Sequence, residues 1–161
     1  MTSLRLGRLD VEIDGARVTL FGRIDDAAPL GGLLDQIGRG EVTIDTDGVS
    51  FVNSIGMREW IRLIRGLRER GDAVVLERVA DVLMAQLNMI SEMREKVRIA
   101  SFHAQYVCSA CGAESAPVID AALHAASLAQ LVAPRLPCAE CSHPMDLGDF
   151  PERYLLIFKT E

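Results

Sequence analysis

The sequence predicts an α/β fold over the first hundred residues, followed by a small cysteine-rich module. In residues 1–97, runs with the alternation of β-strands are followed by runs with the spacing of amphipathic helices, an order typical of a sheet covered by helices. All four cysteines lie after residue 100, in two pairs with the same internal spacing. We therefore expect two domains, at residues 1–97 and 98–161.

Composition and charge limit the classes of function. The chain has 161 residues, 49% of them hydrophobic and 25% charged, which is close to the globular average and excludes a disordered chain. The net charge of −6 is unfavourable for binding nucleic acid or an anionic membrane surface. No apolar run approaches the roughly 18 residues of a membrane span, and residues 1–10 lack the apolar core of a signal peptide. The sequence thus predicts a cytoplasmic protein, without direct membrane insertion, that binds proteins or small ligands.

The first domain is expected to begin with a hairpin. Alternating strands over 9–15 and 16–25 meet at Asp14-Gly15, a pair typical of tight hairpin turns. Later segments alternate between helical and strand periodicity. The further elements expected here are a helix over 28–37, a strand over 42–46 that ends at an Asp47-Gly48 turn, a helix from Asn53–Gly56 to Gly71, a strand over 73–76 and a helix over 79–93.

The second domain is expected to mix strands, cysteine loops and one helix. The sequence predicts a strand over 97–107, an alanine-rich helix over 118–132 between the two cysteine pairs, and a closing strand over 154–158. The connection over 94–98 is short and partly apolar, so we expect the two domains to dock against each other rather than move on a free tether.

Two short motifs carry a resemblance to a known family. Gly22-Arg23-Ile24-Asp25 ends an expected strand, and Asn53-Ser54-Ile55-Gly56 opens the clearest helix. Over roughly residues 9–93 the chain resembles the STAS domain of bacterial anti-anti-sigma factors, and this resemblance implies a mixed sheet with flanking helices. It further implies a non-enzymatic regulatory protein that binds a protein partner, with an anti-sigma serine kinase as the candidate.

Ser54 matches the serine that the family's kinase phosphorylates. A hydroxyl at a helix start can instead cap free N–H groups, and both interpretations of Ser54 stay open on sequence alone. Asn53 stands where the family usually has Asp, and Ile55 replaces a small hydroxyl residue, which suggests a changed contact surface. The candidate partner-binding residues are Asp25, Asn53, Ser54, Ile55, Gly56, Arg58 and Arg62.

The cysteines predict a metal site. Cys108 with Cys111 and Cys138 with Cys141 have the spacing of two loops that present both sulfurs to one ion. The segment is similar to zinc-ribbon and rubredoxin-like modules, with strands before the first loop and after the second expected to pair. Four protein ligands leave no open position, so we expect a structural zinc ion; iron suits the same ligands. His143 is an alternative ligand, although a surface position is the simpler interpretation.

Catalytic motifs are missing from the sequence. It holds no phosphate-binding loop and no nucleophile elbow, and Asp25, Asp26, Asp45 and Asp47 are interpreted as turn residues. His103 and His124 are interpreted as ordinary strand and helix residues. The resemblance to STAS domains also implies a second possible function, a cytoplasmic accessory subunit of a transport complex that binds independently of phosphorylation. A nucleic-acid-binding ribbon is disfavoured, because residues 101–161 contain three basic and seven acidic residues.

Overall fold

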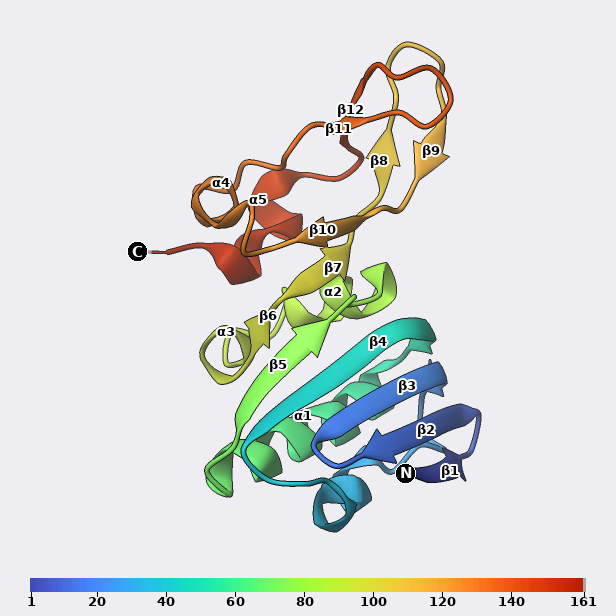
Figure 1. Cartoon of the computed structure of the whole chain (residues 1–161), viewed down its shortest axis with the longest axis vertical. Coiled ribbons are helices and arrows are strands. Elements are labelled where there is room, and N and C mark those ends of the chain that lie inside the picture. Colours follow the sequence, from blue (N-terminus) through green and yellow to red (C-terminus); the bar gives the residue numbers. More distant parts are fainter. Residues whose placement is uncertain (161) are drawn as a thin grey trace.

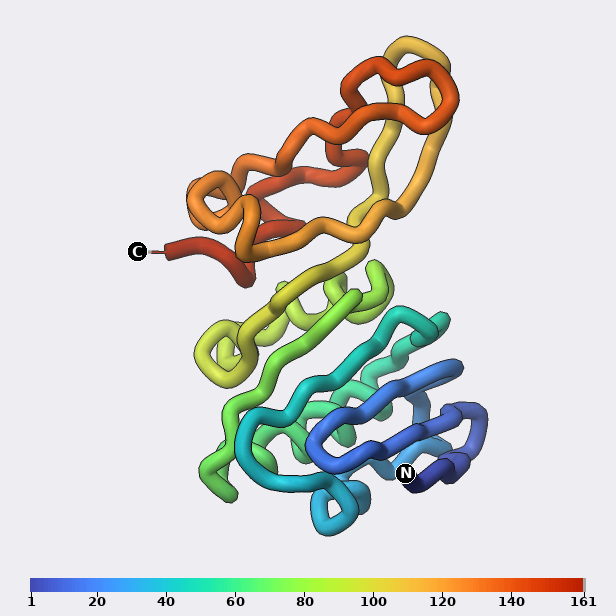
Figure 2. Tube along the Cα trace, in the orientation of Figure 1, coloured from blue at the N-terminus to red at the C-terminus, as the bar shows by residue number. Residues whose placement is uncertain are grey.

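A mixed sheet of six strands forms the first part of the molecule. A computed structural model describes residues 1–160 (Figures 1 and 2). The first three strands pair antiparallel and the rest pair parallel to β3, in the spatial order β1 to β6. The α/β class with a mixed sheet is confirmed. The strands are β1 (Thr2–Leu6), β2 (Leu9–Asp14), β3 (Arg17–Ile24), β4 (Glu41–Val52), β5 (Ala73–Glu77) and β6 (Arg98–Ile99).

Helices cover one face of this sheet. The longest helix, α1 (Ser54–Glu69), lies behind the sheet in Figure 1 and buries a stripe that includes Met57, Trp60 and Leu67. Along β2 the residues alternate between buried and exposed, as expected for a strand with one covered and one open face. The other helices are the 3-10 helix η1 (Leu30–Gln36), α2 (Asp81–Leu87) and α3 (Met93–Lys96). None of the helices in residues 1–160 is long and apolar enough to cross a membrane.

The hairpin, the α1 helix and the strand after it are confirmed, but three other expectations in this part are wrong. The segment 28–37 forms a 3-10 helix, and the segment 79–93 is divided between α2 and α3. The expected turn at Asp47-Gly48 does not form, because β4 continues through it to Val52. Gly48 serves packing instead: a Cβ there would lie 2.3 Å from the ring of Phe21, the residue opposite on β3.

The second part contains two small sheets. A two-stranded sheet joins β7 (Ser101–His103) to β10 (Val118–Asp120), and a four-stranded sheet has the order β11-β12-β8-β9. Its strands are β8 (Tyr106–Val107), β9 (Glu114–Ser115), β11 (Leu136–Pro137) and β12 (Pro144–Leu147). The remaining elements are α4 (Ala125–Ala129), α5 (Pro151–Tyr154) and the 3-10 helix η2 (Leu156–Phe158).

Three sequence expectations fail in this second part. The segment 118–132 begins as strand β10, and only five of its residues form α4. The expected strand over 97–107 is divided into β6, β7 and β8. Residues 154–158 form a helical end rather than a closing strand, because Pro151 starts α5 and Asn88, just after α2, then bonds to the backbone of Tyr154 and Ile157.

Docking between the two parts is confirmed. The side chain of Asn88, after α2, donates to the carbonyl of Tyr154 at 2.6 Å and accepts from the N–H of Ile157 at 2.9 Å. The rings of Phe102 and Phe158 pack with centroids 4.9 Å apart. The buried residues of both parts form one continuous hydrophobic core.

A buried ion pair fastens the end of α1 to the loop before β4. Asp72 accepts from the N–H of Gly40 at 2.9 Å and from the Nε of Arg70 at 2.6 Å. The same arginine donates to the carbonyls of Leu34 and Gly38. Burial acts to raise the pKa of Asp72, but the hydrogen bonds from Gly40 and Arg70 outweigh it and hold the pKa below its usual value.

We expect Asp72→Asn to lower the free energy of unfolding by about 1 to 3 kcal/mol at neutral pH, because it removes a charged acceptor from a buried donor. A lowered pKa contributes stability that is present above about pH 4 and is lost as the pH falls through the folded-state pKa. Urea unfolding at pH 7 and pH 3 should therefore show a deficit that shrinks at the lower pH. The exposed Asp14→Asn is the matched control, and an equal deficit for Asp72→Asn at both pH values would contradict this account.

Candidate functional site

The first cysteine loop is a tight turn closed by backbone hydrogen bonds. The N–H of Cys108 donates to the carbonyl of Ala113, and the N–H of Gly112 donates to the carbonyl of Cys108, both at 2.8 Å. Gly112 has a φ of +76°, in the left-handed region that glycine adopts without strain. The turn places Cys108 in the interior and Cys111 at the surface.

The second loop repeats this geometry. The N–H of Cys138 donates to the carbonyl of His143 at 2.8 Å, and the N–H of Ser142 donates to the carbonyl of Cys138 at 2.9 Å. Ser142 occupies the position equivalent to Gly112 and has a φ of +66°, which costs a non-glycine residue roughly 1 kcal/mol. Cys138 is buried and Cys141 is exposed, so each loop contributes one inner and one outer sulfur.

Strand pairing brings the two loops together. β8 precedes the first loop and β12 follows the second, and they pair antiparallel with Val107 opposite Asp146. The expected pairing of the strands that flank the loops is therefore confirmed, although the strand after the second loop is β12 and not the segment 154–158.

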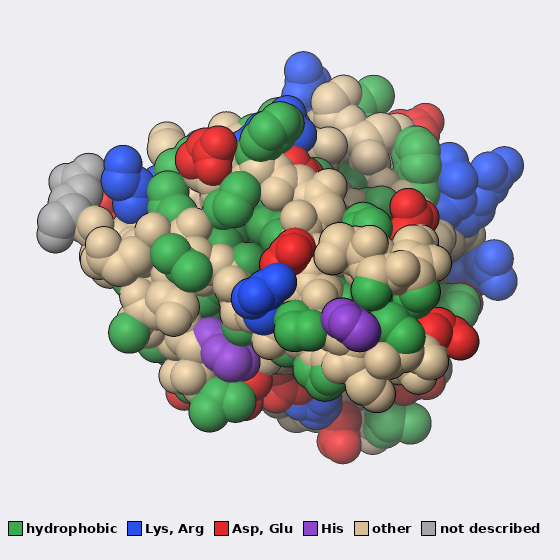
Figure 3. Space-filling view, turned by 90° about the horizontal axis from the view of Figure 1, so that it is seen from above, with side chains coloured by type: hydrophobic (Ala, Val, Ile, Leu, Met, Phe, Trp, Pro, Cys, Tyr) green, Lys and Arg blue, Asp and Glu red, His purple; other side chains and the backbone are tan. Residues whose placement is uncertain are grey.

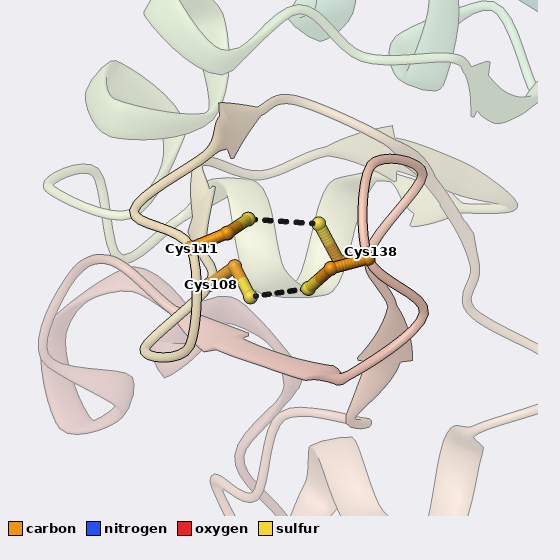
Figure 4. A group of neighbouring side chains, drawn as sticks. Cys108, Cys111 and Cys138 are labelled. Carbon is orange, nitrogen blue, oxygen red and sulfur yellow. Dashed lines mark hydrogen bonds between the residues drawn. The ribbon is translucent and has the colours of Figure 1, made fainter.

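The four sulfurs converge on one point. Figure 4 shows Cys108, Cys111 and Cys138 pointing toward the space between the loops. Cys108 Sγ lies 3.5 Å from Cys141 Sγ, Cys111 Sγ lies 3.7 Å from Cys138 Sγ, and all four sulfurs are within 4.8 Å of one another. Tetrahedral coordination with metal–sulfur bonds of about 2.3 Å places ligand sulfurs about 3.8 Å apart. The four predicted cysteines are thus arranged to hold one metal ion.

Hydrogen bonds and mutual contact set the proton affinities of the thiols. The N–H of Cys111 donates to the sulfur of Cys108, and this bond is the main cause that lowers the pKa of Cys108 to about 6. The N–H of Ala113 lowers the pKa of Cys111, but the hydrogen bond shared with Cys141 and burial outweigh it and raise that pKa to about 12. A metal ion must displace protons from such thiols, so its affinity falls as the pH falls.

His143 lies beside the cluster but is not one of its four converging groups. Its Nδ1 is 3.8 Å from Cys141 Sγ, and its backbone carbonyl closes the second loop. Among the groups of the described residues that could hold a metal, the four cysteines form the set that the geometry brings together.

The second candidate site is the start of α1. The cap of this helix is Asn53, whose Oδ1 accepts from the N–H of Gly56 at 2.8 Å. Ser54 is the first residue of the helix, is exposed, and has no side-chain hydrogen bond within residues 1–160. The interpretation of Ser54 as the helix cap is therefore wrong.

The two sequence motifs meet at this helix start. The N–H of Asn53 donates to the carbonyl of Ile24 at 3.2 Å, and a Cβ at Gly56 would lie 2.1 Å from the same oxygen. Asp25 is buried, and its Oδ1 accepts from the N–H of Ala27 at 3.0 Å, as expected for a turn residue. The carboxylate of Asp25 thus shapes the loop beside the helix start and is not exposed.

Arg58 and Arg62 lie along α1 beside η1, in a groove. Arg62 pairs with Glu59 at 3.0 Å, whereas the side chain of Arg58 makes no ion pair within the part of the chain that the structure describes. The groove is lined by Gly31, Leu34, Arg58, Ile61, Arg62, Arg65, Gly66 and Glu69.

One cluster was missed by sequence reasoning. Asp45 and Asp47 lie within β4 rather than in a turn, so their interpretation as turn residues is wrong. The buried Asp45 pairs with Arg78 and Arg17, and Asp47 contacts His103 on β7. The available signal was the spacing of two, which places both carboxylates on the same face of a strand.

No protein-family model matches the chain, and no curated protein matches it.

We expect Cys111→Ser to abolish stoichiometric metal binding, measured by elemental analysis against a value of about one ion per chain for the unsubstituted protein. Because Cys111 is exposed, the substitution leaves no cavity in the core. Loss of the metal should lower the free energy of unfolding by about 4 kcal/mol or more. Ser109→Ala, in the same loop and also exposed, is the matched control. An affinity for the ion in Cys111→Ser equal to that of the unsubstituted protein would show that Cys111 is not one of its ligands.

Proposed function

We propose that the protein is a non-enzymatic, regulatory adaptor that binds a protein partner through the exposed start of α1 and holds a structural zinc ion between its four cysteines. The partner-binding part of this proposal depends on one observation: the two motifs, distant in sequence, meet at one surface. Gly22–Asp25 and Asn53–Gly56 converge there, and their contact leaves Ser54 and Ile55 exposed at the helix start. This arrangement fits the resemblance to anti-anti-sigma STAS domains.

Ile55 supports a contact role for this surface. Its side chain is 48% exposed, although Met57 and Trp60 of the same helix are buried in the core. Asn53 already caps the helix, so neither Ser54 nor Ile55 is needed for that purpose. An apolar side chain rimmed by a hydroxyl and by Arg58 has the composition of a small protein interface.

Phosphorylation at Ser54 is compatible with this geometry. The hydroxyl is free of side-chain hydrogen bonds in the described residues, and a phosphate in the first turn meets the positive end of the helix dipole. Arg58 lies one turn further along the same side of α1 and carries no ion pair within residues 1–160. The modification would reverse the local charge without unfolding the helix, which is what a reversible contact with a serine kinase of the anti-sigma type requires.

The ligand set supports zinc. Four cysteine sulfurs in a closed tetrahedral arrangement are typical of structural zinc sites, and they leave no position for water or substrate. We expect protein purified without added metal to contain about one zinc ion per chain, measured by elemental analysis, with the affinity decreasing as the pH falls because protons compete for the thiols. One iron ion per chain instead would assign a rubredoxin-like centre.

A protein partner agrees better with the surface than nucleic acid does. On the end of the molecule in Figure 3, Lys and Arg side chains are mixed with Asp, Glu and hydrophobic ones over most of the face. The chain as a whole carries a net charge of −6. Nucleic-acid binding depends on a continuous basic surface that neutralises phosphates.

We expect Ser54→Asp to weaken binding of the partner at least about tenfold while changing the unfolding free energy by less than about 1 kcal/mol, because an acidic residue is favourable in the first helical turn. The partner is identified by placing a photo-crosslinking amino acid at position 55 in the cells of origin. Binding is then measured by calorimetry with the purified partner.

The matched control is Ser127→Asp, which makes the same change at an exposed position of α4. Crosslinking of a serine kinase or a sigma regulator, together with the loss of binding in Ser54→Asp alone, is the expected result. Crosslinking of a transporter subunit that binds Ser54→Asp equally well would instead support the transport accessory function.

A further inference from the structure

His103 joins the two parts of the molecule through both of its ring nitrogens. It lies on β7, the strand that leads from the six-stranded sheet toward the cysteine loops. Nε2 is 2.5 Å from Oδ1 of Asp47 on β4, and Nδ1 is 2.7 Å from the carbonyl oxygen of Ala116, before β10. The side chain of His103 is 20% exposed and that of Asp47 is 41% exposed, so water reaches the contact from the Asp47 side.

Both groups that face the ring are hydrogen-bond acceptors. A backbone carbonyl only accepts, and the Asp47 carboxylate, which also pairs with Arg78 at 3.5 Å, accepts as well. Neutral imidazole carries one N–H, and the protonated ring carries two. Only the protonated ring of His103 can donate to both acceptors at once, whereas the neutral ring directs a lone pair at one of them.

The other polar groups around β7 are already engaged. Asp81 of α2 accepts from Gln105 at 2.8 Å, and Asp120 of β10 accepts from the N–H of Leu123 at 3.0 Å. The hydroxyl of Tyr154 on α5 donates to the carbonyl of His103 at 2.6 Å. Burial is the main cause that raises the pKa of this tyrosine, so it stays protonated. Histidine is the type of side chain among these that changes charge near neutral pH.

We propose that His103 is a proton-dependent latch that fastens the segment carrying the cysteine loops to the open face of the sheet. With two ring protons, the imidazolium bonds to Asp47 on one side and to Ala116 on the other. Loss of one proton removes one of these two bonds and loosens β7 and β10 from β4. The doubly protonated ring makes both bonds. The amides of β7 and β10 are therefore protected from hydrogen exchange at low pH, and this protection is lost as the pH rises.

Two measurements on the zinc-loaded, full-length protein test the latch between pH 5.5 and pH 8. Nitrogen-15 NMR of the histidine rings counts the protons on Nδ1 and Nε2 of His103. Hydrogen exchange gives the protection factors of the β7 and β10 amides, each corrected for the intrinsic effect of pH. We expect both ring nitrogens to be protonated at pH 5.5, and the protection to fall about tenfold as the ring loses a proton.

Substitutions separate the latch from other effects of pH. In His103→Gln the fall in protection should be absent. Asp47→Asn should also abolish it, because an asparagine amide can donate to the neutral ring. His124→Gln is the matched control for loss of a histidine. The side chain of His124 makes no capping hydrogen bond to α4, and this variant keeps any pH dependence of the metal site.

Either of two results would overturn the proposal. The first is a His103 ring with a single proton at pH 5.5 in the unsubstituted protein. The second is a fall in protection that persists in both His103→Gln and Asp47→Asn at the size seen in His124→Gln.

Discussion

The long central strand β4 is the constraint on which the rest of the structure depends. It pairs parallel to β3 on one side and to β5 on the other, and β3 and β4 end together at Ile24 and Val52. Because parallel strands end at the same edge, Asp25 and Asn53 follow side by side, and the start of α1 is placed against the loop after β3. In its middle, β4 presents Asp45 to two arginines and Asp47 to β7. One strand thus positions both the helix surface and the joint to the cysteine loops.

Local signals in the sequence were sufficient for the β2–β3 hairpin, for α1 and for the strand after it. The β2–β3 hairpin and α1 have strong periodicity, and Gly71, with a φ of +95°, ends the helix as expected. The errors lie where a residue is determined by a contact distant in sequence. Gly48 resembles a turn residue but makes room for the ring of Phe21. The apolar run 154–158 has strand composition, yet Asn88 bonds to its backbone and the run ends in a 3-10 helix.

The candidate sites also differ in how well local sequence signals predict them. The four-cysteine cluster was predictable because each loop is a local turn whose spacing is itself the signal, and strand pairing only has to bring two such loops together. That Asn53 rather than Ser54 caps α1 was harder to predict from the sequence. Asn53 and Ser54 are both good capping residues, and one residue of difference in the helix start decides which side chain accepts the bond. The contact of His103 with Asp47 joins residues 56 positions apart, so no local pattern indicates it.

The metal site and the His103 contact act on the same segment in different ways. An ion held by the four sulfurs would join the two cysteine loops to each other and so set the internal geometry of these loops. His103 attaches that segment to β4 through Asp47, and Asn88 attaches it to the end of α2 through the backbone of Tyr154 and Ile157. Of these attachments, the contact through Asp47 depends on a proton, whereas the contacts of Asn88 with Tyr154 and Ile157 involve no titratable side chain. Loss of a ring proton from His103 would therefore alter how firmly the cysteine loops are held to the sheet while the loops themselves keep their shape.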